Sequence, residues 1–265
     1  MSRPAVKPKK ALGQHFLADE SVARRIAATI DSCQGMPVIE VGPGMGALTR
    51  WLLEAGHDVT VVEIDTESVE YLRRHMPVLE NRIIEKDFLG LDLDALFPGR
   101  DYCVIGNYPY NISSQIFFHI LDHRDRCRCC AGMLQREVAE RLAAPPGTKA
   151  RGILSVLLQA WYDVEYLFTV AEGVFVPPPK VKSGVVRLTR NSVGHLGCDE
   201  RLFKTVVKTT FGQRRKTIRN SIKPLLPPGC AIPESPLMAQ RPEQLSVSEF
   251  IELTNLVSKS RDEGI

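Results

Sequence analysis

The chain of 265 residues contains no apolar run that approaches the length of a membrane span, and we expect no secretory signal peptide at its start. Its seven cysteines are an odd number without a secretory context, which argues against a disulfide framework and for reduced thiols. The cysteine spacing at 127–130, near His119 and His123, matches no closed zinc pattern, so we expect no bound metal. With a charged fraction of 25%, ordinary for a globular protein, these absences predict a cytoplasmic protein.

Acidic residues are missing from two basic stretches. The first eighteen residues carry Arg3, Lys7, Lys9 and Lys10 without an acid, and we expect a disordered basic arm there. Residues 201–233 contain eight basic side chains and no acidic one. Such a block is more typical of a surface that faces a polyanion than of a plain solvated face. The sequence therefore favours nucleic acid as a partner.

The dinucleotide-binding pattern Gly-x-Gly-x-x-Gly is also missing. Instead, a strand expected over 36–41 ends in a Gly-x-Gly-x-Gly turn at Gly42–Gly46, before a helix expected over 47–55. Glycines in this turn, Gly42 and Gly44 above all, let the backbone approach a ligand and let the helix begin close to the sheet. A tight turn without a ligand has the same pattern, so this turn alone identifies no site.

Polar side chains follow two further expected strands. The strand over 58–62 ends at Glu63, an acid placed to accept both hydroxyls of a ribose, and the strand over 82–86 ends at Asp87 and Phe88. Asp87 is suited to an adenine amine and Phe88 to supporting the ring, although each acid by itself also fits a solvated strand end. Because carboxyl ends of parallel strands meet at one edge of a sheet, we expect one crevice there. Its members are Gly42, Gly44, Glu63, Asp87 and Asn107.

The turn Asn107–Tyr110, of sequence Asn-Tyr-Pro-Tyr, follows a buried strand expected over 101–106. An amide oxygen and a backbone carbonyl both accept hydrogen bonds from an exocyclic amine, and a tyrosine face stacks on the base that carries it. An ordinary turn would also suit Asn and Pro. Ser113 or Ser114 is expected to cap a helix that begins near Gln115. Together with the crevice, the turn predicts recognition of an adenine or cytosine amine.

The rest of the chain continues the α/β pattern and then becomes helical. We expect helices over 115–121, 135–143 and 153–160, strands over 129–134, 162–170 and 185–189, a basic exposed loop over 144–151, and a stiff segment over 175–181. The strand over 185–189 is expected to close the sheet. After a linker at 195–199, helices are expected over 201–211, 214–223 and 247–258. In the first of these, Lys204 and Lys208 share a face above Phe203, Val206 and Val207.

Four segments of the chain closely resemble the KsgA family of small-subunit rRNA adenine N6,N6-dimethyltransferases. They are 40–49, 106–114, 175–183 and 211–221, and the likeness runs from about Gly13 to Ser221. The block Gln213–Lys216 is its most specific part. Without it, the macrolide-resistance methyltransferases of large-subunit rRNA would be a serious alternative. The resemblance implies a Rossmann-like class I methyltransferase domain, a small helical C-terminal domain, and S-adenosylmethionine as methyl donor.

The resemblance also implies roles for individual residues. Asn107, the Tyr108–Pro109 carbonyl region and Tyr110 would hold the target base, with Phe175 stacking on its other side. Contacts to the donor would come from His15, Leu17, Gly42, Gly44, Glu63, Ile64, Asp87, Phe88 and Asn107. Two positions depart from the family: His15 stands where many members have Asn, and Tyr108 where an aliphatic residue is usual.

The expected substrate is a pair of adjacent adenosines in a hairpin loop near the 3′ end of 16S rRNA, within a partly assembled 30S subunit, and we expect a monomeric enzyme. The expected domains are an N-terminal arm and cofactor-loop entry (1–18), a methyltransferase domain (19–194) and a helical RNA-binding domain (195–265). Candidates for phosphate contacts are Arg136, Arg141, Lys149, Arg151, Lys204, Lys208, Arg214, Arg215, Lys216 and Arg219. A macrolide-resistance type of activity, and an assembly factor whose methylation is secondary, stay open as alternatives.

Overall fold

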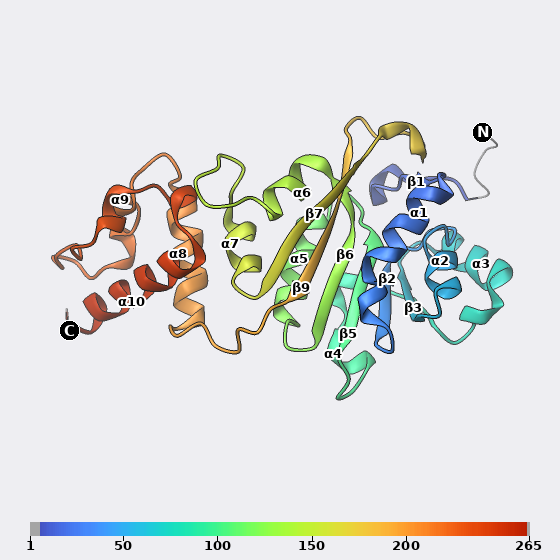
Figure 1. The fold of residues 1–265 in the computed structure, drawn as a ribbon, viewed down its shortest axis with the longest axis horizontal. Helices are drawn as coiled ribbons and strands as arrows, with labels where there is room; N and C mark the ends of the chain where they lie inside the picture. Colours follow the sequence, from blue (N-terminus) through green and yellow to red (C-terminus); the bar gives the residue numbers. More distant parts are fainter. Residues whose placement is uncertain (1–5, 264–265) are drawn as a thin grey trace. The chain divides into compact units, whose positions relative to one another are not determined.

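The computed structural model describes residues 6–263. They divide into two compact units (Figure 1). One unit holds the chain up to Glu140 together with Val164–Arg190, and the other holds Arg141–Asp163 together with the chain from Asn191. Packing therefore groups Arg141–Asp163 with the C-terminal part. The sequence had placed this segment in the methyltransferase domain, before the boundary at 194. The division into a methyltransferase domain and an RNA-binding domain stays a prediction.

The first unit is organised around a seven-stranded sheet of order β4-β3-β2-β5-β6-β9-β7. The strands are β2 (Pro37–Val41), β3 (Asp58–Glu63), β4 (Ile83–Glu85), β5 (Tyr102–Asn107), β6 (Cys127–Gln135), β7 (Tyr162–Val170) and β9 (Ser183–Arg190). Strands β4, β3, β2, β5 and β6 pair in parallel, and β9 pairs antiparallel to β6. The expectation that β9 closes the sheet was wrong, because β9 lies between β6 and β7. A two-stranded antiparallel sheet joins β1 (Phe16–Leu17) to β8 (Phe175–Val176).

Helices of this unit cover the sheet on both faces. They are α1 (Glu20–Ala27), α2 (Thr49–Glu54), α3 (Thr66–His75), α4 (Leu93–Leu96), α5 (Ser113–Asp122) and α6 (Arg136–Leu142), and Figure 1 shows α1, α2 and α3 gathered around the β2–β4 end of the sheet. Alternate residues of a strand face opposite sides. Cys103 and Ile105 of β5 belong to the core cluster that includes residues of α1 and α2, whereas Cys130 of β6 contacts Tyr108, which packs on Phe117 of α5. The carboxyl ends of the parallel strands remain free for a site.

Local capping was predicted correctly at one helix and wrongly at another. Asp19 caps α1, since its Oδ1 accepts from the backbone N–H groups of Ser21 (2.9 Å) and Val22 (3.2 Å). Helix α5 instead has Ile112 at its N-cap and no side-chain cap, so the cap predicted at Ser113 or Ser114 was wrong. The helix begins earlier than expected, and the buried Ser113 hydroxyl donates to the Tyr110 carbonyl at 3.2 Å.

The N-terminal stretch was expected to be disordered. Residues 1–5, including Arg3, lie outside the described residues. From Val6 onward the chain is placed, with a 3-10 turn at Lys10–Leu12 followed by β1. The prediction of disorder was therefore wrong for this part.

The second unit is helical, with α7 (Ile153–Gln159), α8 (Glu200–Gly212), α9 (Ile218–Ser221) and α10 (Val247–Glu263). Phe203, Val206 and Val207 of α8 are buried while Lys204 and Lys208 are exposed, as predicted. The helix predicted over 214–223 is only the short α9. Arg214–Lys216 form a turn closed by the Lys216 N–H on the Gln213 carbonyl at 2.8 Å.

Among residues 6–263, no helix combines the length and the apolar composition needed to cross a membrane.

Candidate active site

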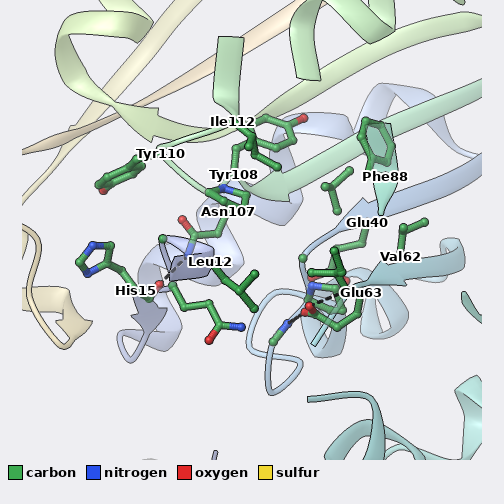
Figure 2. A pocket seen from close by; sticks show the side chains of 18 of the residues that line it. Leu12, His15, Glu40, Val62, Glu63, Phe88, Asn107, Tyr108, Tyr110 and Ile112 are labelled. Carbon is green, nitrogen blue, oxygen red and sulfur yellow. Dashed lines mark hydrogen bonds between the residues drawn. The ribbon is translucent and has the colours of Figure 1, made fainter. Parts of the chain in front are cut away.

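A cavity of about 280 Å³ lies at the carboxyl ends of β2, β3, β4 and β5. It is lined by all nine cofactor-binding candidates and by the whole turn Asn107–Tyr110, which are therefore brought together as predicted. In the view of Figure 2, His15 and Tyr110 lie to one side of Asn107, while Glu40, Glu63 and Phe88 lie to the other. The cavity thus has two ends. We name them after the methyl acceptor and the methyl donor expected there: the acceptor end (His15 and Tyr110) and the donor end (Glu40, Glu63 and Phe88).

The glycine turn after β2 forms the floor beside the donor end. Gly44 has a φ of 55°, and a Cβ there would lie 2.9 Å from the ring of Phe16. At Gly46, a Cβ would lie 2.5 Å from Met76 Sδ. The turn therefore requires glycine for both its backbone angles and its close packing.

Glu63 is held at the donor end by three backbone N–H groups. Its Oε2 accepts from Gly44 at 3.1 Å, and its Oε1 accepts from Ile64 and Asp65, each at 2.9 Å. Burial raises the pKa of Glu63, while these hydrogen bonds oppose the rise. Only 4% of the residue is exposed, so the carboxyl is fixed in position at the cavity wall.

Glu40 is a site residue that the sequence reasoning missed. It lies on β2 with 1% exposed, lines the same cavity, and its Oε2 has no hydrogen-bond partner among the described residues. Burial raises its pKa to about 8; Thr49 opposes the rise and the charge of Glu63 adds to it. The sequence did contain a signal for Glu40, which is an acid inside an apolar strand. A buried acid needs a partner of opposite charge, so this position could have been predicted to bind a cation.

Asn107 has its amide orientation fixed by the N-terminal segment. Its Nδ2 donates to the His15 carbonyl at 3.0 Å, a bond drawn in Figure 2. An amide has its acceptor oxygen opposite its donor nitrogen. The Oδ1 of Asn107 is therefore left to accept a hydrogen bond inside the cavity.

Tyr108 contributes packing and backbone. Its side chain is 1% exposed, its hydroxyl donates to the Ala131 carbonyl at 2.8 Å, and its N–H donates to the Met133 carbonyl at 2.9 Å. The ring fits because Gly132 has no side chain: a Cβ there would lie 2.7 Å from Tyr108 Cε2. The Tyr108 ring therefore occupies space left by Gly132, and an aromatic residue at this position does not reduce the volume of the cavity.

Tyr110 presents a positioned ring at the acceptor end. Its hydroxyl lies 2.6 Å from Ser183 Oγ, and its ring centroid lies 5.5 Å from that of His15. Phe175 is 2% exposed, belongs to the core cluster and does not line the cavity. The expectation that Phe175 offers a face to the base is wrong for this structure, because pairing of β8 with β1 places its ring in the core.

The RNA-contact candidates lie in both units, and one of them is wrong. Arg151 is fully buried: its Nη1 donates to the Ala144 carbonyl (2.7 Å) and to Gln159 Oε1 (2.6 Å), and its Nε donates to the Leu245 carbonyl (3.2 Å). Burial lowers its pKa to about 10. It holds three segments of the second unit together and cannot reach a phosphate.

The other candidates are accessible. Arg214 is half-buried, and its Nη2 donates to the Lys149 carbonyl. The remaining candidates are exposed: Arg136, Arg141, Lys149, Lys204, Lys208, Arg215, Lys216 and Arg219. Of these, Arg136 pairs with Glu140 at 2.7 Å. Their contacts with RNA stay predictions.

Residues 5–259 match the family model described as ribosomal RNA adenine dimethylase. The chain is 66% identical to the ribosomal RNA small subunit methyltransferase A of Parabacteroides distasonis over 254 residues, covering 96% of this chain and 95% of the relative. It is 62% identical to the protein of the same name from Bacteroides thetaiotaomicron, covering 96% of each.

Two solved structures are similar along most of the chain. A dimethyladenosine transferase from Plasmodium falciparum has a TM-score of 0.74 at 24% identity, covering 93% of this chain and 98% of that one, which shows a shared fold. The 23S rRNA methyltransferase ErmE has a TM-score of 0.66 at 25% identity, covering 93% and 99%. Both likenesses extend across the α/β and the helical parts.

Proposed function

The chain belongs to the ribosomal RNA adenine dimethylase family, and from this premise we propose that it methylates the N6 amines of two adjacent adenosines in a hairpin loop near the 3′ end of 16S rRNA. S-adenosylmethionine is the methyl donor. The observation that carries the proposal is the Asn107 amide, whose oxygen is left as an acceptor between the donor and acceptor ends of one cavity. The small-subunit names of relatives at 62–66% identity favour this activity over the large-subunit alternative.

The donor end fits S-adenosylmethionine. This donor supplies a methyl group on a sulfonium and also carries an ammonium group. Glu40, with an orphaned buried oxygen, is suited to that cationic part, because a buried carboxyl is stabilised by a positive partner. Glu63 has a fourth lone-pair position left for ribose hydroxyls, and the half-exposed Ile64 is an apolar cover for the adenine.

Asp87 lies at the adenine end of the same wall. Its Oδ1 accepts from the Leu89 N–H at 3.0 Å, which orients the carboxylate and leaves the other oxygen for an adenine amine. Phe88 is 4% exposed and packs edge-on against His119, so it supports the wall from beneath.

The acceptor end would activate a poor nucleophile. The lone pair of an adenine amine is delocalised into its ring, and acceptors on both amine hydrogens pull the nitrogen toward a pyramidal shape. Asn107 Oδ1 is one acceptor; the Pro109 carbonyl already accepts from Ile112 at 3.2 Å, which favours the Tyr108 carbonyl as the other. Fixed acceptors stabilise charge that builds on the nitrogen, and alignment supplies much of the rate.

Tyr110 would stack on the flipped adenine. Anchoring of its hydroxyl by Ser183 keeps the ring in one place, so little side-chain entropy is lost when a base binds. Stacking of this kind contributes about 1–3 kcal/mol per base. With Phe175 in the core, Tyr110 and the tilted His15 ring are the aromatic groups at this end.

The proposed partner is a partly assembled 30S subunit, with the exposed basic residues contacting phosphates. We propose a monomer that works in the cytoplasm. A role in assembly independent of methylation is separated by comparing growth of a deletion strain with growth of an Asn107→Ala strain.

Mass spectrometry of small-subunit rRNA tests the activity. A strain lacking this protein is complemented with the wild type, with Asn107→Ala, or with Asn81→Ala, which makes the same chemical change in an exposed turn. We expect N6,N6-dimethyladenosine with the wild type and Asn81→Ala, and none with Asn107→Ala. Full modification by the Asn107 variant, or methylation found in large-subunit rRNA instead, contradicts the proposal.

A further inference from the structure

The segment Lys9–Leu17, which we call the strap, lies along the cavity and contributes six of its lining residues, Leu12–Leu17. The strap is held by contacts at Ala11, at His15 and at its end. The Asn111 side chain donates to the Ala11 carbonyl at 3.4 Å, and His15 Nδ1 lies 2.9 Å from the Pro177 carbonyl. Pairing of β1 with β8 fixes its end. The strap is therefore part of the site wall.

The first residue of the strap is tied to a buried carboxylate. Lys9 Nζ forms an ion pair with Asp65 Oδ1 and lies 3.1 Å from Glu67 Oε1. Gln14 joins the same cluster: its Oε1 accepts from the Lys9 N–H at 2.8 Å, and its Nε2 donates to Asp65 Oδ2 at 3.2 Å. The Asp65 side chain is 1% exposed and that of Lys9 is 39% exposed.

The contact between Lys9 and Asp65 depends on the charge of both side chains. A buried carboxylate requires a cation and hydrogen-bond donors. Although burial alone raises the pKa of Asp65, hydrogen bonds from Lys9, Gln14 and Ser68 hold it below its usual value. The same contact raises the pKa of Lys9. Lys9 and Asp65 are therefore both charged at neutral pH.

The two ends of the strap meet different parts of the reaction site. Asp65 also donates its N–H to Glu63 Oε1 at 2.9 Å, at the donor end. The His15 carbonyl accepts from Asn107 Nδ2 at 3.0 Å, at the acceptor end. The strap therefore contacts Asp65, the neighbour of Glu63 at the donor end, and also the Asn107 amide at the acceptor end.

We propose that Lys9 and Asp65, with Gln14 between them, are positioning residues for methyl transfer. Their ion pair holds the strap so that the His15 carbonyl keeps Asn107 Oδ1, and not Nδ2, directed at the adenine amine. A rotation of the amide by half a turn would set N–H groups against the amine hydrogens and remove an acceptor from the reaction. One neutral hydrogen bond is weak, so a loosely held strap would leave the amide free to rotate. The proposal rests on the proposed function.

Steady-state kinetics with partly assembled small subunits tests the positioning role. The variants are Lys9→Ala, Lys9→Arg, and Lys10→Ala as the matched control, since Lys10 is the neighbouring exposed lysine. For Lys9→Ala we expect kcat to fall about tenfold at saturating donor, which is about 1.4 kcal/mol of activation free energy, with the KM for RNA within about twofold. Lys9→Arg and Lys10→Ala should keep the wild-type kcat.

Three outcomes overturn the proposal. An unchanged kcat in Lys9→Ala means that the ion pair does not position the amide. A higher KM for the donor with kcat preserved means that the strap only shapes the donor pocket. An equal loss in Lys10→Ala points to general attraction of RNA by the basic segment and likewise overturns it.

Nuclear magnetic resonance decides the matter without activity. The side-chain amide signal of Asn107, assigned by its loss in Asn107→Ala, should shift toward that of a solvated amide and exchange faster in Lys9→Ala. It should stay at the wild-type position in Lys9→Arg and Lys10→Ala. An unmoved signal in Lys9→Ala overturns the positioning role. If instead the wild type methylates no rRNA, the proposed function fails while this measurement still judges the ion pair.

Discussion

The donor and acceptor ends of the cavity are built in different ways. At the donor end, Glu63 is fixed by N–H groups of residues close to the strand ends. At the acceptor end, Asn107 depends on His15 and Tyr110 depends on Ser183, each more than seventy positions away in the chain. With the roles proposed above, the comparison teaches that donor binding would rely on local backbone geometry, whereas alignment of the target amine would rely on distant segments being in place.

The largest expected effect comes from Asn107→Ala. Loss of one fixed acceptor should lower kcat by roughly 10²–10³-fold, as for other preorganised polar groups that act on developing charge. Binding of S-adenosylhomocysteine, measured by calorimetry, should change by less than about threefold, because eight of the nine expected donor contacts remain. If donor affinity fell as much as kcat, the assignment of separate roles to the two ends of the cavity would be contradicted.

Glu63→Ala should have the opposite profile. Removing the carboxylate leaves three N–H groups without their acceptor and removes the contact expected for the ribose. We expect donor affinity to fall roughly 10–100-fold, at 1.4 kcal/mol per factor of ten. The kcat at saturating donor should fall much less. Calorimetry and methyl-incorporation assays provide the two quantities, and a variant that loses only kcat would reverse the assignment.

Tyr110 separates stacking from anchoring at the acceptor end. Tyr110→Ala removes a stacking face worth about 1–3 kcal/mol, so the KM for rRNA should rise roughly 10–100-fold. Tyr110→Phe keeps the ring and loses only the Ser183 contact, so its KM should stay within about threefold. Equal defects in both variants would show that the hydroxyl matters more than the ring.

Glu40 should make donor binding depend on pH. With its pKa raised to about 8, Glu40 is mostly neutral in the free protein at pH 6, and a bound ammonium favours its ionised form. Binding then releases a proton, so affinity for S-adenosylhomocysteine should rise from pH 6 to about 7.5, where an α-amine of pKa roughly 8 is still charged. Calorimetry in buffers of different ionisation enthalpy measures the proton released, and Glu40→Gln should abolish it.

The same carboxyl should affect folding stability. Its pKa is higher in the folded protein than its ordinary value of 4.5, so the unfolded chain loses this proton first as pH rises. The Glu40 contribution to the free energy of unfolding should therefore decrease between about pH 4.5 and 8, by a few kcal/mol. Glu40→Gln should be more stable than the wild type at pH 8, by thermal unfolding, and equal curves at pH 5 and 8 would contradict the buried acid.

The smallest effect is expected on the basic surface. Arg215→Ala should weaken RNA binding severalfold and reduce the slope of log affinity against log salt by about one unit, because one phosphate contact is lost. Arg151→Met should leave that slope unchanged and lower the melting temperature, because carbonyls of three segments lose their donor. An effect of Arg151→Met on the salt slope would contradict its burial.

Much of the donor end was predictable because its signals are local. Strands β2, β3, β4 and β5 appear as short apolar runs, and the residues that follow them, such as Gly42, Glu63 and Asp87, must share one edge when such strands pair in parallel. Glu40 was missed because an acid within an apolar strand carries no signal for the direction its carboxyl faces.

Predictions failed where a residue's environment comes from elsewhere in the chain. Arg151 looked like part of a basic exposed loop, and only its tertiary contacts with Ala144, Gln159 and Leu245 show that it is buried. Residues 214–217 have helical composition, yet the turn at Gln213–Lys216 stops the helix before α9. Phe175 was placed by resemblance, and pairing with β1 put its ring in the core.

By itself, the sequence determined the α/β order, the edge of the sheet where a ligand binds and the set of polar groups available there, because strand periodicity and strand-end chemistry are properties of adjacent residues. Only the tertiary structure decided which of those groups are oriented and charged. The orientation of Asn107 depends on His15, and the ionisation of Glu40 depends on burial and on Glu63. Hydrogen bonding and desolvation depend on atoms within a few ångströms, and in a folded chain those atoms come from residues far apart in sequence.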